Sequence, residues 1–145
     1  MVTKLKYAGV SHDDLLEIYV LFIRSVTEYC SVAFHSSLTV EQSNKLEQIQ
    51  KVCLKIILGD MYVSYPAALE MSGLKTLYER RQDRCLDFAI KCNKHPKNRR
   101  LFPLRHINKC REEEKFTVNF ASGTKYQNSS IPFCQRLLNE NYKVK

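Results

Sequence analysis

The stretch TLYERRQDRCLDFAIKCNKHP, from Thr76 to Pro96, decides the fold. Thr76 with Glu79 three residues later forms a capping box, the pairing of side chains that marks the start of a helix. Proline at position 96 ends the pattern, because its ring clashes with the preceding turn and it has no N–H to donate. Apolar residues recur between these limits at helical spacing: Leu77, Cys85, Phe88, Ala89 and Cys92. The stretch therefore predicts a helix with one apolar face.

A second helix is predicted to begin at Ser11, which makes a capping-box pair with Asp14. An apolar stripe with a period of 3.6 residues follows: Leu15, Ile18, Tyr19, Phe22, Ile23, Val26 and Cys30. Because the stripe is wide and aromatic, we expect this helix to be the one packed most deeply between the others.

Two more helices are predicted between these, after a short connection over residues 31–38. The first begins at Thr39, whose capping partner is Gln42, and ends at Gly59. The second is brief and covers residues 64–73, with a proline in its first turn, where the missing N–H costs nothing, and a glycine at its end.

The chain changes character beyond Pro96, where the helical period weakens. Residues 116–120 alternate like a strand, but a lone strand has no partner, so an extended tail segment is predicted there. The sequence as a whole predicts an all-α fold, a compact bundle of about four helices from Ser11 to His95. The expected division is a helical domain over residues 1–95 and a partly irregular basic C-terminal extension over residues 96–145.

The net charge of +8 is unevenly distributed. Residues 1–76 carry −1, residues 77–100 carry +5 and residues 101–145 carry +4. A positive field of this kind favours polyanions, either nucleic acid or an anionic membrane surface. No apolar run approaches the ~20 residues that a membrane span needs, and the start of the chain lacks the apolar core of a secretory signal. We therefore expect an intracellular protein, nuclear or cytoplasmic, without a membrane partner.

The six cysteines show no C-x-x-C pair and no histidine at zinc-finger spacing. Cys85 and Cys92 share a helix face near His95, but cysteines buried in a helix face are far commoner than a metal site of that geometry. The sequence places no base beside a thiol, as a nucleophilic cysteine requires. We expect reduced thiols packed mostly in the core, no catalytic residues, no metal ligands and no cofactor: Cys30, Cys53, Cys85, Cys92, Cys110 and Cys134.

Four strings resemble the thumb and C-terminal region of reverse transcriptases from jockey-like non-LTR retrotransposons, in the same order and at similar spacing. They are IRSVTEYCSVAFHSSLT (Ile23–Thr39), LEQIQKVCLKIILG (Leu46–Gly59), SYPAALEMSGLKTLYERRQDRCLDFAIK (Ser64–Lys91) and SSIPFCQRLLN (Ser129–Asn139). The resemblance implies a helical thumb that follows the polymerase palm and grips the primer–template duplex. It also implies that the palm would be a partner within a larger protein.

The palm motif of that family, an aromatic and a small residue followed by two aspartates, is absent from the chain. Asp13 and Asp14 do not replace it. Polymerase aspartates hold Mg²⁺ from a strand turn with a third carboxylate nearby, whereas these two are expected in the first turn of a helix, where they complement its dipole. We therefore expect no polymerase activity from the isolated chain.

The basic helix and the residues after it are the best candidates for a binding site. Arginine binds phosphate bidentately through its planar fork, and lysine adds a point charge. A solvated helix face explains the same charges, because Asp83 and Asp87 can relieve the repulsion between neighbouring arginines. The predicted nucleic-acid-binding residues are Arg80, Arg81, Arg84, Lys91, Lys94, Lys97, Arg99 and Arg100.

Aromatic residues of the tail, such as Tyr126 and Phe133, could stack on bases. Anchoring the tail to the core is the favoured interpretation, because Ile131 and Leu137 are apolar neighbours. The predicted function is thus a non-catalytic nucleic-acid-binding fragment of an RNA-directed DNA polymerase, with RNA–DNA or DNA duplex as partner. The alternative is a helical protein-interaction or remnant domain with no nucleic-acid binding of its own.

Overall fold

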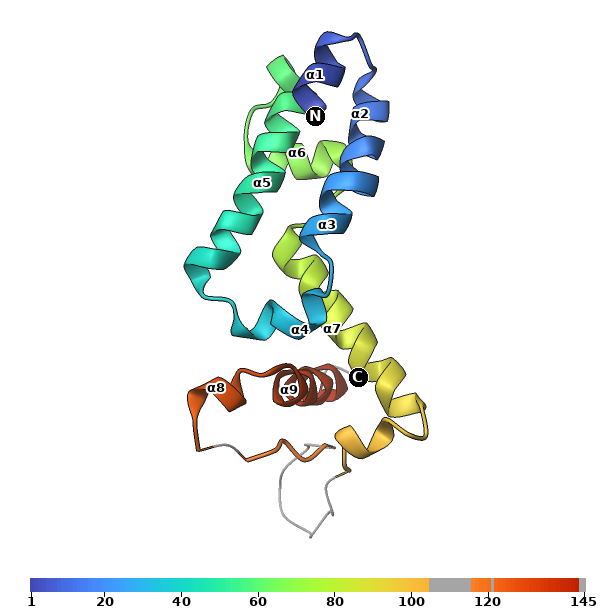
Figure 1. Cartoon of the computed structure of the whole chain (residues 1–145), viewed down its shortest axis with the longest axis vertical. Helices are drawn as coiled ribbons and strands as arrows, with labels where there is room; N and C mark the ends of the chain where they lie inside the picture. The colour runs from blue at the N-terminus through green and yellow to red at the C-terminus, as the bar shows by residue number, and fades with distance from the viewer. Residues whose placement is uncertain (105–115, 121, 144–145) are drawn as a thin grey trace. The chain divides into compact units, whose positions relative to one another are not determined.

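The computed structural model describes residues 1–104, 116–120 and 122–143 (Figure 1). Cys110, named above among the thiols, lies outside the described residues. Over the described ranges the chain is helical without a strand, which confirms the all-α prediction. The helices are α1 (Val2–Tyr7), α2 (His12–Ile18), η1 (Tyr19–Arg24), α3 (Ser25–Thr27), α4 (Ser31–Phe34), η2 (His35–Ser37), α5 (Val40–Leu58), η3 (Gly59–Met61), α6 (Tyr65–Ser72), α7 (Leu77–Lys94), η4 (Arg99–Leu101), α8 (Thr124–Gln127) and α9 (Ser130–Lys143).

The described part of the chain holds more helices than the four expected. It forms two compact units, one of residues 1–29 and 38–80 and the other of residues 30–37 and 81–145. These units interleave along the sequence and do not coincide with the predicted ranges 1–95 and 96–145, whose status as domains stays a prediction. In the described ranges no single helix has the length and apolarity to cross a bilayer, although the bent pair Val40–Met61 and Tyr65–Ser72 does by length and composition alone.

The predicted helix starts are confirmed by their capping hydrogen bonds. Ser11 Oγ accepts the backbone N–H of Asp14 at 3.2 Å, so Asp13 and Asp14 lie in the first turn of α2. Thr39 begins α5 with its complete capping box, and Ser64 begins α6. Thr76 begins α7, where its Oγ1 accepts from Glu79 N at 3.1 Å.

The first unit closes around α1, α2 and α5, which contact one another. Helix α1 was not predicted from the sequence. Lys6 of α1 donates its ammonium to two carbonyls at the end of α5, those of Ile56 at 2.5 Å and Ile57 at 3.3 Å. These carbonyls lack helical partners, and a cation also complements the negative end of the helix dipole. The core of this unit consists of Val2, Leu15, Tyr19, Cys53 and Ile57.

The helix predicted to begin at Ser11 continues from α2 through a π-helical segment, η1, into α3. A π turn has more residues than an α turn, so the side chains after it point in new directions. The half-buried Ile23 packs against the core at a four-residue step from Tyr19. Phe22 and Val26 are 61% and 75% exposed. The expectation of a deeply sandwiched helix therefore holds for Tyr19, which is 1% exposed, but is wrong for Phe22 and Val26.

A buried amide fixes the place where α7 begins. Gln50 of α5 is fully buried, accepts from Tyr19 Oη at 2.7 Å, and donates to Lys75 O at 3.0 Å. Three residues earlier, the Glu47 carboxylate accepts the backbone N–H groups of Leu77 at 3.1 Å and Tyr78 at 3.3 Å. An anion at these unpaired N–H groups also complements the helix dipole.

The second unit is built on α7, α4 and α9, and α9 lies beside α4 (Figure 1). Two expectations are wrong here. Residues 31–38 are mostly helical instead of a plain connection, and the extension, expected to be partly irregular, contains a helix over residues 130–143 that was not predicted. The apolar positions of α9 follow helical spacing and pack on the apolar face of α7. The core residues are Cys85, Ala89, Cys92, Phe102, Phe116, Cys134, Leu137 and Leu138.

The extended segment 116–120 is held by side chains of α9 and by residues 103–104, where Thr117 N donates to Pro103 O at 2.9 Å. Phe116 makes one isolated antiparallel bridge with Leu104. The Asn139 carboxamide pairs with both backbone groups of Phe116, at 2.9 and 3.0 Å, and Gln135 Oε1 accepts from Asn119 N at 2.9 Å. Two amide side chains one helical turn apart thus replace a second strand, which confirms the expected extended segment.

Candidate nucleic-acid interface

Arg80, the first predicted phosphate ligand on α7, is engaged within the first unit. Its guanidinium binds both carboxylate oxygens of Glu28, from Nε at 2.6 Å and from Nη2 at 3.2 Å. The Glu28 side chain is 1% exposed, and that of Arg80 is 29% exposed. A buried carboxylate that loses its partner is strongly destabilising, so this arginine has a structural task.

Arg81 is buried in the second unit with no exposed surface. Its Nε donates to Nδ1 of His35 at 3.5 Å. The imidazole of His35 also meets the ring of Phe133 edge to face, with ring centroids 5.3 Å apart. Burial first, and then the neighbouring guanidinium, lower the pKa of His35, which keeps the imidazole neutral and able to accept. A nucleic acid cannot reach Arg81 in this arrangement, so we set Arg80 and Arg81 apart from the candidate surface.

The remaining six predicted residues are all exposed. Arg84 lies on α7 between Asp83 and Asp87, whereas no acidic residue occurs from position 88 to position 104. Five cations share this acid-free range, at the end of α7 and on η4. We call them the α7–η4 basic cluster: Lys91, Lys94, Lys97, Arg99 and Arg100.

Some aromatic residues of the tail pack against the core, and others are exposed to solvent. Phe133 packs against the core of the second unit, which confirms the anchoring expected for it. Tyr126 is 49% exposed and Phe120 is 92% exposed. Phe120 therefore offers an aromatic surface that the sequence analysis did not single out.

The cysteines of the described residues are free thiols, as predicted, and all but Cys30 are buried. Cys85 and Cys92 lie in the core of the second unit, whereas His95 is exposed, so these three do not gather into a metal site. Across the described ranges no group of three or more acidic, cysteine or histidine residues is placed to hold a metal. A hydrogen bond with Cys85, and burial, raise the pKa of the Cys134 thiol, which keeps it protonated.

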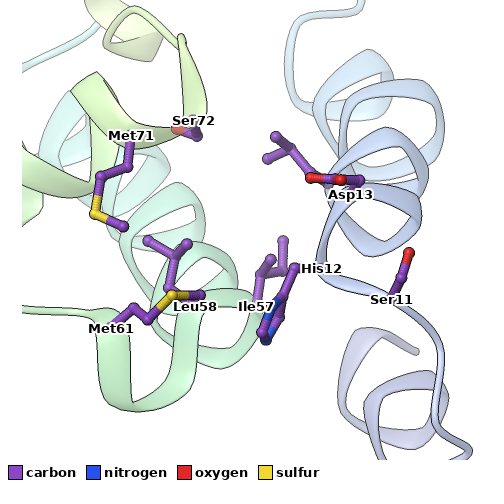
Figure 2. A pocket seen from close by; sticks show the side chains of 9 residues that line it. Ser11, His12, Asp13, Ile57, Leu58, Met61, Met71 and Ser72 are labelled. Atoms are coloured by element: carbon purple, nitrogen blue, oxygen red, sulfur yellow. The ribbon is translucent and has the colours of Figure 1, made fainter.

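The first unit contains a pocket of about 390 Å³. Figure 2 shows His12 and Asp13 on one side of it and Met61 and Met71 on the other. Its lining mixes polar and apolar side chains, and none of the lining residues is a lysine or arginine. It has no cation for a phosphate, so it is not part of the candidate interface. The lining residues are Ser11, His12, Asp13, Leu16, Ile57, Leu58, Met61, Met71 and Ser72.

The burial of Arg81 has a sequence signal that was available. Leu77, Arg81 and Cys85 follow one another at four-residue steps, so the arginine occupies a position of the apolar stripe. The burial of Glu28, at the end of α3, had no such signal, because no neighbouring residue in the sequence marks it as buried. Phe120 could have been found from the alternation of residues 116–120, which places Phe116 and Phe120 at equivalent positions but does not show which one is buried.

The likeness to reverse-transcriptase thumbs rests on the four sequence strings given above. The comparisons with protein-family models, with curated proteins and with solved structures found no match to this chain.

Proposed function

We propose that this chain is a non-catalytic nucleic-acid-binding fragment, of the kind found in the thumb of non-LTR retrotransposon reverse transcriptases. The observation that carries the proposal is the α7–η4 basic cluster, five exposed cations in a range without an acidic residue. Clustered lysine and arginine on one part of a domain favour a phosphate backbone as partner. The all-α fold and the resemblance of the four strings support the same assignment.

The chemistry assigned to this surface is phosphate contact alone. Arginine and lysine neutralise phosphates and release their counterions, which gives affinity without base sequence. In a longer protein the fragment would hold a primer–template for a palm that supplies the catalytic aspartates. The chain itself is proposed to have no polymerase activity, because the palm motif is absent from its sequence.

The test is the salt dependence of duplex affinity. We expect the log of the affinity to fall steeply with the log of the salt concentration for the intact chain. Lys91→Gln, Lys94→Gln and Lys97→Gln together should weaken binding and reduce the magnitude of that slope by about 0.9 for each phosphate that is no longer neutralised, up to about 2.7. Fluorescence anisotropy with a labelled duplex measures both quantities.

A matched control makes the same three changes elsewhere: Lys4→Gln, Lys55→Gln and Lys125→Gln. All three of these lysines are exposed and outside the cluster. The control should keep the slope of the unchanged chain. Equal loss of affinity in both triple variants, or a flat salt profile for the unchanged chain, would contradict the proposal.

A second candidate function is supported by an apolar surface in the first unit. Leu21 and Phe22 of η1, Val26 of α3 and the following Tyr29 are 57–75% exposed. Large exposed apolar patches on a domain mark protein-interaction sites, and these four side chains lie within nine residues of chain. We call these four residues the η1–α3 apolar face. It favours a helical interaction domain, whose test is given in the Discussion.

A further inference from the structure

Phe120 is the most exposed of the large apolar side chains in the described ranges, at 92%. A phenylalanine ring so exposed adds nothing to the core. Its backbone position is nevertheless well defined, because the preceding Asn119 is held twice. The backbone N–H of Asn119 donates to Gln135 Oε1 at 2.9 Å, and its side-chain Nδ2 donates to Tyr126 Oη at 3.4 Å.

The same Gln135 side chain also holds the end of η4. Its Nε2 donates to the carbonyl of Leu101 at 2.7 Å, and Leu101 directly follows Arg99 and Arg100. Gln135 itself is fully buried. One buried carboxamide thus joins the segment that carries the exposed ring to the segment that carries two cations of the α7–η4 basic cluster.

Cations beside an exposed aromatic ring are the combination that single-strand-binding proteins use. The cations follow the phosphate backbone, and successive bases stack on the rings. In a duplex the bases are already stacked on one another and are covered on both faces. A protein ring at a duplex surface therefore has no base face to meet, whereas an unpaired strand offers one.

We propose that the α7–η4 basic cluster and Phe120 together bind a single-stranded stretch of nucleic acid, with an unpaired base stacked on the Phe120 ring. This inference rests on the proposed function, because it requires that the cluster contacts phosphates. It names the substrate of that site more narrowly, as an unpaired strand such as an overhang beside a duplex.

The experiment compares three labelled probes over the same series of salt concentrations: an oligodeoxythymidine, an abasic strand of the same length, and a blunt duplex. Phe120→Leu removes the ring and keeps an apolar side chain. It should weaken oligodeoxythymidine binding at least about fivefold, the lower end of what one base–aromatic stack contributes. Binding of the abasic strand and of the duplex should stay unchanged, because the abasic strand has no bases and the duplex exposes no base face along its length.

Two further variants sharpen the result. Phe22→Leu makes the same change at an exposed ring of the first unit and should leave all three affinities unaltered. Phe120→Trp should retain or tighten oligodeoxythymidine binding, since a larger ring stacks at least as well. The slope of affinity against salt should be the same for Phe120→Leu as for the unchanged chain, because no cation is removed.

The outcomes distinguish a failure of the stacking inference from a failure of the proposed phosphate-binding function. If the lysine triple variant weakens every probe but Phe120→Leu weakens none, stacking on Phe120 is wrong and the phosphate-binding surface stands. If the unchanged chain binds no probe in a salt-dependent way, both are wrong. An equal loss of affinity for the abasic strand and for oligodeoxythymidine in Phe120→Leu also overturns stacking, because it shows that the base is not what the ring recognises.

Discussion

The position of the Arg81 side chain is determined both by packing and by its positive charge. Its stem fills a core position of α7, and its guanidinium donates to a neutral imidazole, that of His35. Long cationic side chains often bury their methylene stems in this way, but the charged head usually reaches water. Here the head stays inside, so the protonation state of His35 controls whether a second positive charge appears beside it.

Acid should therefore destabilise the fold through His35. The pKa of His35 is lowered in the folded chain, while in the unfolded chain it returns to about 6.5. Below that pH the unfolded state binds a proton that the folded state does not, so the free energy of unfolding falls as the pH drops, by at most about 1.4 kcal/mol per pH unit. Urea denaturation between neutral pH and about pH 5 measures this slope.

The variant His35→Gln isolates the contribution of the imidazole. Glutamine keeps an acceptor for Arg81 but does not titrate, so the pH slope should flatten even if the variant is less stable overall. His12→Gln, at an exposed histidine, serves as the control and should keep the slope. A slope that is the same in both variants would show that another group is responsible.

At the scale of elements, local signals predicted helix starts well. Thr39, Ser64 and Thr76 each begin a helix where the sequence placed one, because a cap is formed by residues three positions apart. The face of a helix was less predictable. The period of 3.6 residues that the sequence analysis applied beyond Tyr19 does not hold through a π segment, and no local residue type marks such a segment.

Helices that depend on distant partners were missed. The short α4 and η2 bury Ser31 and His35 against residues nearly a hundred positions later, such as Ser130, whose hydroxyl donates to Ala33 O at 2.9 Å. Short helices are marginal by themselves, and tertiary packing stabilises them. Of the candidate site, the exposed lysines and the burial of Arg81 could be predicted from sequence, whereas the pairing of Arg80 with Glu28, 52 positions away, required the tertiary structure.

The η1–α3 apolar face gives a prediction about association. If it is a protein-interaction surface that also contacts a second copy, the chain should self-associate with rising concentration. Phe22→Ser with Val26→Ser should then shift the sedimentation coefficient to that of a monomer. Because both side chains are already exposed, the free energy of unfolding should change by no more than about 0.5 kcal/mol for each.

The comparison is with Tyr7→Ser and Val63→Ser, which remove two apolar side chains that are 88% and 85% exposed elsewhere in the first unit. That pair should leave the sedimentation behaviour as it is. If the two double variants behave alike, self-association does not depend on the η1–α3 apolar face, and the second candidate function loses its support.

At the scale of the whole chain, the second unit cannot be completed by residues 1–95. The apolar face of α7 packs on Cys134, Leu137 and Leu138 of α9 and on two phenylalanines beyond residue 100. A fragment ending at His95 keeps that face but lacks everything that covers it. Uncovering so large a buried surface should cost far more than one large-to-small core substitution, which costs about 2–5 kcal/mol.

We therefore expect the fragment 1–95 to bind a hydrophobic dye such as ANS and to show little protection of the backbone amides of α7 beyond Arg81 in hydrogen exchange. Amides of α5, in the first unit, should stay protected. The full chain, measured in parallel, should bind little dye. A fragment with protected α7 amides and no dye binding would instead support residues 1–95 as an independent domain.

The chain passes between its two units three times, after Tyr29, after Ser37 and after Arg80. This order has a consequence for synthesis on the ribosome, where residues emerge from the N-terminus onward. All segments of the first unit are available once Arg80 has emerged. The residues of α4 emerge much earlier than α9, against which they pack. Before α9 has been translated, α4 lacks the helix against which it packs. The first unit can therefore fold on the nascent chain, whereas the second can assemble only afterwards.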